Sequence, residues 1–495
     1  MIRVPRVVAT AALLAALLPV LTLASEVSAG EESWSGDFSF ESGSGVEYPV
    51  SLEREDGGLR FTWPASALPR WDTALLEVTS LDTGDEPRVH FGIGAEGMEA
   101  SAAPDRLQSL DPKARGARWL NLSSLRGGVG AGAVVRLETQ ALTLAEGTAR
   151  LRLFDNRLDL AGTILVIAAH PDDAEIAAFG LYADRRAFIV TLTSGNAGDM
   201  NYAANVSDPA AHYRLKGYLR AVDSVTVPWL GGIPPSRTFN LGYFDSLLEA
   251  MERTPDVPLA EAYGPNTDVA VYRRANIGDL LPKGPRTNTW NHLVDDLVTI
   301  LRKTRPTLIV TPDPRLDGHT DHEYATVALV QAMRRWRGEA RFLLYTNHAV
   351  EDRYPFGPAG TVVSLPPRPA GTVSLASVYS HPTDPQLQLR KLFALEAMHD
   401  LRPAPAEQLP GATERATRED YPRIPAVDYF RRGPRANELF YVYRRDQLQR
   451  LVQSFLEARA VCASLHAIRR FDSYRPRAID DDVAISEVEL APGER

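Results

Sequence analysis

The stretch Ile164-Leu165-Val166-Ile167-Ala168-Ala169-His170-Pro171-Asp172-Asp173 decides the fold of this chain. Six apolar residues in a row are typical of a strand buried on both faces of a parallel sheet. The run then ends abruptly in a histidine, a proline and two carboxylates. Because parallel sheets present their polar chemistry at the carboxyl ends of their strands, the stretch predicts a first strand followed directly by a polar site.

Strand-like and helix-like segments alternate from Ala161 onward. The predicted strands lie at 188–192, 307–311 and 342–345, and the predicted helices at 174–186, 292–302 and 323–336. This alternation predicts a mostly parallel, doubly wound, Rossmann-like sheet with helices on both faces, in a domain over 157–445. Residues 228–285 are rich in Pro, Gly and Asn with little periodicity, so we expect a long insertion that lies over the site.

A second polar cluster follows the strand predicted at 307–311, in the run His319-Thr320-Asp321-His322. Both clusters are expected at the same edge of the sheet, where His170, Asp173 and His322 would offer two imidazoles and a carboxylate. That donor set suits one Zn²⁺ per chain with a fourth position open, and other divalent metals stay as alternatives. The competing interpretation is that the aspartates of the two clusters cap the helices that follow.

The runs Ala169 to Asp173 and His319 to His322 together resemble the two motifs of the LmbE-like, or PIG-L, N-acetylglucosaminide deacetylases. Weaker similarities lie at 193–198, 241–245, 391–399 and 438–440, so the resemblance covers roughly 160–445. It implies zinc-dependent hydrolysis of the N-acyl, most simply N-acetyl, amide of an amino sugar in a glycan or glycoconjugate, with release of acetate.

The resemblance also implies a role for residues that do not bind the metal. Asp172 corresponds to the general base. His319 would stabilise the charge that develops on the carbonyl oxygen or protonate the leaving amine, and Asp321 would keep that imidazole charged and oriented.

Three further positions match those that contact the sugar in this family: Arg214, Asp245 and Asn196. Two departures stand among them. Gly217 replaces the glutamate usual three residues after the arginine, and Asn196 occupies a position that is usually acidic. Neither departure alters a predicted metal ligand.

Residues 30–156 have a different pattern, in which short β-rich runs are separated by Gly, Pro and Asp. This pattern predicts a β-sandwich of jelly-roll type. Trp63, Trp71 and Trp119 are either core residues, the better-supported interpretation, or stacking platforms of a glycan-binding module. The second interpretation leads to the alternative function, a non-catalytic exported glycan-binding protein in which the Rossmann-like domain is a scaffold.

The amino end reads as an export signal over 1–29, with Arg3 and Arg6, an apolar stretch from Val7 to Ala24, and a cleavage site after Ala29. We expect a periplasmic or extracellular protein with no stable membrane span after cleavage; an uncleaved anchor is the alternative. Residues 446–495 are predicted to form a carboxy-terminal helix and tail. The net charge of −9 argues against nucleic acid as a partner.

Overall fold

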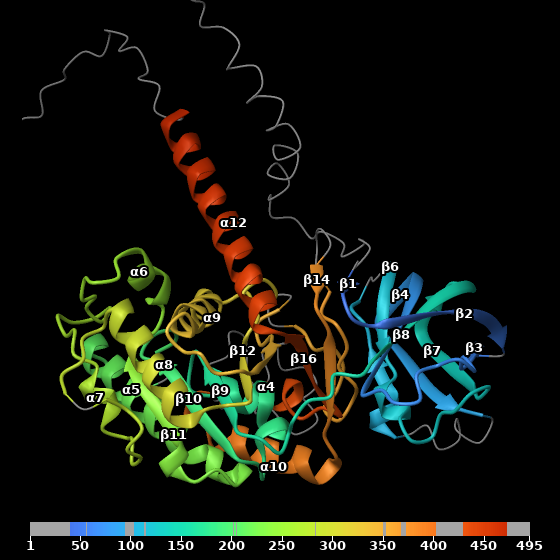
Figure 1. Ribbon diagram of the computed structural model, residues 1–495, viewed down its shortest axis with the longest axis horizontal. Coiled ribbons are helices and arrows are strands. Elements are labelled where there is room, and N and C mark those ends of the chain that lie inside the picture. The colour runs from blue at the N-terminus through green and yellow to red at the C-terminus, as the bar shows by residue number, and fades with distance from the viewer. Residues whose placement is uncertain are drawn as a thin grey trace, which may run out of the picture.

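The computed structural model of the chain contains a barrel-like β-sheet and a doubly wound α/β unit (Figure 1). The structure describes residues 40–55, 57–94, 103–112, 115–200, 202–203, 205–282, 284–349, 353–367, 373–401 and 429–472. The predicted export signal at 1–29 and the tail beyond residue 472 lie outside the described residues. Within the described part of the chain, no helix combines the length and apolarity that a membrane crossing requires.

The second half of the chain forms a seven-stranded sheet in the order β11-β10-β9-β12-β13-β16-β15. The first five strands in this order are parallel to one another. Strand β16 is antiparallel to both β13 and β15. The strands are β9 (Ile164–Ala168), β10 (Ala187–Thr193), β11 (Thr238–Tyr243), β12 (Leu308–Pro312), β13 (Arg341–Tyr345), β15 (Val378–Pro382) and β16 (Asn437–Tyr443).

Helices pack on both faces of this sheet, as the α/β pattern predicted. Alternate residues of β9 supply the two cores: Leu165 and Ile167 join the cluster that contains α8, α9 and the start of α12, and Ile164 and Val166 join the cluster that contains α4 and part of α10. The helices are α4 (Asp173–Tyr182), α5 (Pro209–Thr226), α6 (Leu248–Arg253), α7 (Ala270–Arg273), α8 (Trp290–Thr304), α9 (Thr320–Met333), α10 (Pro385–Ala397), α11 (Tyr429–Arg432) and α12 (Arg445–Asp472).

The strand order reverses direction between β9 and β12. The chain continues from β9 to β10 and β11 on one side, and β12 and β13 are added on the other. In open α/β sheets, ligands bind outside the carboxyl ends of the two strands at such a reversal. The two polar clusters of the sequence follow these two strands.

The segment 228–285 is more ordered than we expected. It contains β11, whose six residues are all buried, as well as α6 and α7 and the short 3-10 helices at Val227–Gly231 and Pro235–Arg237. The expectation that the whole segment is an insertion over the site does not hold for β11, which is a strand of the sheet. Asn240 and Gly242 interrupt the apolar pattern that would have indicated this strand.

The amino-terminal strands form one sheet that closes on itself, so the predicted sandwich of two separate sheets is not confirmed. The ring runs β4-β7-β3-β2-β8 and returns to β4, with β5 and β6 paired at the margins of β4. The strands are β2 (Val46–Glu55), β3 (Gly58–Thr62), β4 (Thr73–Ile93), β5 (Leu107–Ser109), β6 (Gly116–Asn121), β7 (Val134–Leu144) and β8 (Gly147–Phe154).

Closure comes from β4 and β2, because each of these strands changes partner along its length. The first part of β4 pairs with β8 and its last part with β7, while β2 pairs first with β8 and then with β3. Such strands turn the corners of a closed or folded sheet. Sequence periodicity predicts strands, but it does not indicate that one strand pairs with different neighbours along its length.

The barrel packs closely against the α/β unit. Leu75, Trp119 and Phe154 of the barrel belong to the same apolar cluster as Leu375 and Val378. Trp63, Trp71 and Trp119 are each at most 8% exposed, so none of them is a surface platform for a sugar. The core interpretation of the three tryptophans is confirmed. A short parallel pair, β1 (Phe40–Ser42) with β14 (Val373–Leu375), adds a further link.

Candidate active site

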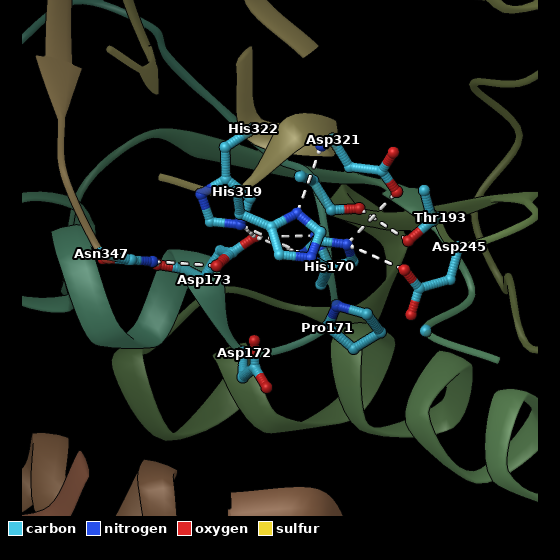
Figure 2. A network of polar contacts seen from close by, with 12 residues as sticks. His170, Pro171, Asp172, Asp173, Thr193, Asp245, His319, Asp321, His322 and Asn347 are labelled. Carbon is cyan, nitrogen blue, oxygen red and sulfur yellow. Dashed lines mark hydrogen bonds and ion pairs between the residues drawn. The ribbon is translucent and has the colours of Figure 1, made fainter. Parts of the chain in front are cut away.

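The three side chains predicted to bind the metal meet at the carboxyl ends of β9 and β12 (Figure 2). His170 Nδ1 lies 3.1 Å from His322 Nε2 and 3.6 Å from Asp173 Oδ2, and His322 Nε2 lies 3.1 Å from the same carboxylate oxygen. All three residues are buried. Segments 149 residues apart in the sequence therefore form one triangle of donor atoms.

The triangle has the size that a tetrahedral zinc ion requires. Ligand atoms about 2.0–2.2 Å from zinc at tetrahedral angles lie roughly 3.3–3.6 Å from one another. The separations of 3.1, 3.1 and 3.6 Å are close to that range. The donor set of two imidazoles and one carboxylate therefore fits the metal that the sequence predicts.

The second ring nitrogen of each imidazole faces a carboxylate. His170 Nε2 lies 3.1 Å from Asp245 Oδ1 and 3.4 Å from Asp321 Oδ2, and His322 Nδ1 lies 3.1 Å from Asp317 Oδ2. A carboxylate in this position orients an imidazole that binds a metal and increases its basicity. The sequence placed Asp245 at the sugar and Asp321 beside His319, whereas the structure places both carboxylates against His170.

The charges of this cluster favour a cation. Four carboxylates surround two imidazoles, so the imidazoles alone do not balance the negative charge. Burial by itself would lower the pKa of His322, but Asp173 and Asp317 raise it to about 10. Burial would likewise raise the pKa of Asp173, but the two imidazoles lower it well below its usual value. Asp173 is therefore ionised at neutral pH.

Helix capping does not account for these aspartates. The Asp172 carboxylate makes no capping hydrogen bond to α4. Asp173 Oδ2 accepts a hydrogen bond from the backbone N–H of His170 at 2.7 Å. The cap of α9 is His319, whose Nδ1 accepts from the backbone N–H of Asp321. The competing interpretation from the sequence is therefore not supported.

Asp172 is held in an unusual backbone conformation. Its φ of 119° and ψ of −31° are rare for a residue with a side chain, and such outliers persist where the surrounding structure forces them, often at active sites. Its Oδ2 accepts a hydrogen bond from Arg220 Nη2 at 2.9 Å. Burial, together with Asp173 and Asp400, raises its pKa to about 6 against the opposing effect of Arg220. A carboxylate with this pKa is a better proton acceptor than a free aspartate.

His319 lies beside the triangle and is partly exposed. Its ring centre is 4.5 Å from that of His170 and 5.2 Å from that of His322. Burial and the two neighbouring imidazoles lower its pKa to about 4. Asp321 contacts it through a backbone N–H, while the Asp321 carboxylate accepts from the backbone of Ser246 and Leu248. The structure therefore does not show the carboxylate–imidazole contact that we expected between Asp321 and His319.

Arg220 is a functional candidate that our sequence analysis missed. It is buried on α5, contacts Asp172, donates to the backbone carbonyls of Pro171 and Gly195, and lies 3.3 Å from Asp400. Its position in the sequence could have indicated a buried arginine, because helical spacing places Arg220 on the same face as the buried residues Tyr213, Gly217 and Ser224. A charged residue on the apolar face of a helix indicates a buried partner.

Asp317, Asn347 and His348 were also not assigned a role. Asn347 Nδ2 donates to Asp173 Oδ1 at 2.9 Å, and Asp317 accepts from the backbone of the loop that carries Asn347 and His348. The His348 ring centre lies 4.8 Å from that of His322, within reach of the same cation. Asn347 and His348 follow β13, a third strand end that the spacing of the two motifs does not reveal.

Of the predicted sugar contacts, only Arg214 is exposed. Its guanidinium donates to Glu261 Oε1 at 3.0 Å, and half of its side chain is accessible. Asn196 is buried, where its Oδ1 accepts from the backbone N–H of Asp245 and its Nδ2 donates to the Tyr272 hydroxyl. In the structure, Asn196 and Asp245 thus support the loop beside His170.

The two departures from the family pattern occur at one place. A Cβ atom on Gly217 would lie 2.7 Å from Asn196 Cβ and 2.7 Å from the Tyr272 ring. Any larger side chain at 217 would displace one of the two. The glycine and the asparagine are therefore parts of one local packing arrangement, with Tyr272 filling the space.

The fold and the site together define a class: a doubly wound α/β domain with a His/Asp cluster that could hold a cation at its topological switch point. Residues 165–333 form a PIG-L family domain, and the matching family description reads GlcNAc-PI de-N-acetylase. The resemblance seen in the sequence is thereby confirmed. A comparison with curated proteins finds no match.

Solved structures with similar architecture include two deacetylases. N,N'-diacetylchitobiose deacetylase from Pyrococcus horikoshii is 16% identical, with a TM-score of 0.32, over 58% of this chain and 85% of that chain. The A40926 pseudoaglycone deacetylase is 17% identical, with a TM-score of 0.32, over 58% of this chain and 98% of that chain. These low scores add nothing to the assignment of function.

Proposed function

We propose that this protein is a metal-dependent N-deacetylase that removes an acyl group, most simply acetyl, from an amino sugar in a glycan or glycoconjugate. The observation that carries the proposal is the triangle of His170, Asp173 and His322 donor atoms, with sides of 3.1–3.6 Å, directly beside the strained Asp172. The PIG-L domain over 165–333 supports the same reaction.

The metal would be held by His170, Asp173 and His322. A zinc ion bound there would polarise the amide carbonyl and would lower the pKa of a bound water to near neutrality. Asp245 and Asp321 orient His170, and Asp317 orients His322, so that the ligand nitrogens face one point.

Asp172 would accept the proton of the attacking water, because its raised pKa brings it close to neutrality while it stays ionised at pH 7. Arg220 fixes the carboxylate at 2.9 Å and so limits its rotation. His319, which protrudes beside the triangle, would donate a hydrogen bond to the carbonyl oxygen. Its Nδ1 already accepts from the Asp321 backbone, so in the neutral ring the proton is on Nε2.

The experiment that tests the proposal combines metal analysis with acetate release. The purified protein should contain about one zinc ion per chain and release acetate from a panel of N-acetylglucosamine-containing glycans and glycoconjugates. Asp172→Asn should retain the metal and lose turnover by about 10²–10⁴-fold, as expected for loss of a general base.

Sugar binding with bound zinc but no acetate release would overturn the proposal and favour a glycan-binding protein. The structure offers less to that alternative than the sequence did, because the three tryptophans of the barrel are buried. Export to the periplasm or exterior is part of our proposal; fractionation of the native host, with amino-terminal sequencing of the mature chain, tests it.

A further inference from the structure

A polar cavity lies next to the candidate metal site. It is bounded by α4, by the residues after β13 and by the segment that leads into β16. Its volume is about 60 Å³. Since a water molecule needs roughly 10–15 Å³ of such space, the cavity has room for a group of several atoms. The charged residues that line it are Lys391, Arg432, Arg435 and Glu438.

The arginines near this cavity donate to backbone carbonyls. Arg435 donates to the carbonyls of Phe356 and Gly357, and Arg432 donates to those of Tyr354 and Asn347. Arg435 is only 3% exposed, and its Nε has no hydrogen-bond partner among the described residues.

The one carboxylate in the lining is already engaged. Glu438 accepts hydrogen bonds from the backbone N–H groups of Gly180 and Leu181 and from Lys391 Nζ at 2.8 Å. Among the described residues, the lining therefore carries three cationic groups and one anionic group, and that anion is bound to the lysine.

Two other arginines with little exposed surface each lie beside a carboxylate. Arg220 lies 2.9 Å from Asp172, and Arg315 lies 3.2 Å from Asp313. These carboxylates raise the pKa of each arginine despite burial. Burial, with Arg431 and Arg432 nearby, instead lowers the pKa of Arg435 to about 9. Among the described residues, no carboxylate pairs with Arg435. Because a buried guanidinium without a counter-charge is costly, an anion that enters the cavity would be favoured.

We propose that this cavity is a binding site for a small oxyanion, a phosphate or carboxylate group, held by Arg435 together with Arg432. The guanidinium is the side chain best suited to such groups, because its N–H donors match paired oxygens. The site is distinct from the metal centre but adjoins it. Asn347 lines the cavity with its backbone carbonyl bonded to Arg432, and its side chain donates to Asp173.

Calorimetric titration of the full-length protein with inorganic phosphate and, separately, with acetate tests the proposal and distinguishes the two kinds of oxyanion. At least one should bind, and should raise Tm above its value in chloride at equal ionic strength. Arg435→Met should weaken that binding by about tenfold or more, because charged hydrogen bonds are lost. Arg390→Met, which removes an arginine from the surface pair with Asp184, is the matched control and should leave it unchanged.

Two further variants separate this site from other sources of the signal. His322→Ala removes a metal ligand and should still bind the oxyanion, whereas loss of binding would assign the anion to the metal centre and overturn the proposal. Arg435→Lys keeps the charge and should bind with intermediate affinity if Arg435→Met does not fold. Absence of binding by the wild-type protein, or equal affinity in the Arg435 variants, would also overturn it. All of these readouts are independent of deacetylation.

Discussion

His170, Asp173 and His322 form a compact group of donor atoms, and His319 lies just outside their triangle. The His322 ring is fully buried between two carboxylates, whereas His319 is partly exposed and its Nδ1 is occupied by a backbone N–H. This difference in surroundings supports the proposed roles, in which His322 binds the metal and His319 acts on the substrate.

His322→Ala should therefore lose most of its zinc, and His319→Ala should retain it while turnover falls by about 10²-fold or more. Metal content by mass spectrometry, measured beside acetate release, checks both variants. Equal zinc content in the two purified proteins would contradict this division of roles.

His381, on β15, gives a pH dependence that does not involve the metal. It is buried, its Nδ1 lies 2.9 Å from the Tyr379 hydroxyl, and burial lowers its pKa from 6.5 to about 4. The unfolded chain therefore binds a proton below pH 6.5 that the folded protein does not, so stability is lost as pH falls from 6.5 towards 4.

Between pH 7.5 and 5 this residue should lower the free energy of unfolding by about 2 kcal/mol. Urea unfolding at the two pH values measures it, and His381→Gln should reduce the difference by that amount. An unchanged pH dependence in the variant would show that other groups cause the acid sensitivity.

At the scale of elements, α5 does more than cover the sheet. On one face of this helix, Arg220 donates a hydrogen bond to Asp172, and Gly217 packs against Asn196 and Tyr272. Asn196 in turn accepts from the backbone N–H of Asp245. The position of α5 therefore controls two carboxylates of the site.

Gly217→Ala tests this packing. Within a helix, alanine is ordinarily more stable than glycine by about 1 kcal/mol. Here the new Cβ would lie 2.7 Å from two neighbours, so we expect a loss of about 1–3 kcal/mol instead. Chemical denaturation measures the sign.

The control for that variant is Gly130→Ala, because a Cβ at 130 has no neighbour within 4 Å. It should change the free energy of unfolding by less than about 0.5 kcal/mol. Stabilisation of the protein by Gly217→Ala would show that Asn196 and Tyr272 move freely and that the packing does not constrain the site.

At the scale of the whole molecule, the barrel and the α/β unit share a buried polar seam as well as an apolar cluster. Asn121 Nδ2 donates to the Val363 carbonyl and the Ser380 hydroxyl, and Asn156 Nδ2 donates to the Val378 carbonyl. Because these groups are buried, separating the two parts would leave polar atoms without partners. We therefore expect the two parts to unfold together.

Asn121→Ala should lower the free energy of unfolding by about 1–3 kcal/mol and shift a single calorimetric transition as a whole. Glu53→Gln, which alters an exposed ion pair of the barrel, should have little effect. Two separate transitions in the wild-type protein would contradict a shared interface.

The sequence was most informative where chemistry follows a strand directly. The strand at 164–168, the ligand types His170, Asp173 and His322, and the doubly wound order follow from local pattern and spacing. Arg220 escaped because its partner Asp172 lies 48 residues away. The contacts of Asp245 and Asp321 with His170 were not predicted for the same reason, since only the fold decides which imidazole a carboxylate faces.

By itself, the sequence determined β9, β10, β12 and β13, the helices α4, α8 and α9, and the donor atoms that follow β9 and β12, because hydrophobic periodicity and ligand chemistry are local properties of the chain. The closure of the amino-terminal sheet, and the lack of a partner for Arg435 Nε among the described residues, were decided by the tertiary structure alone. Each of these depends on which distant segments share a surface, and burial and electrostatic energy are set by those neighbours.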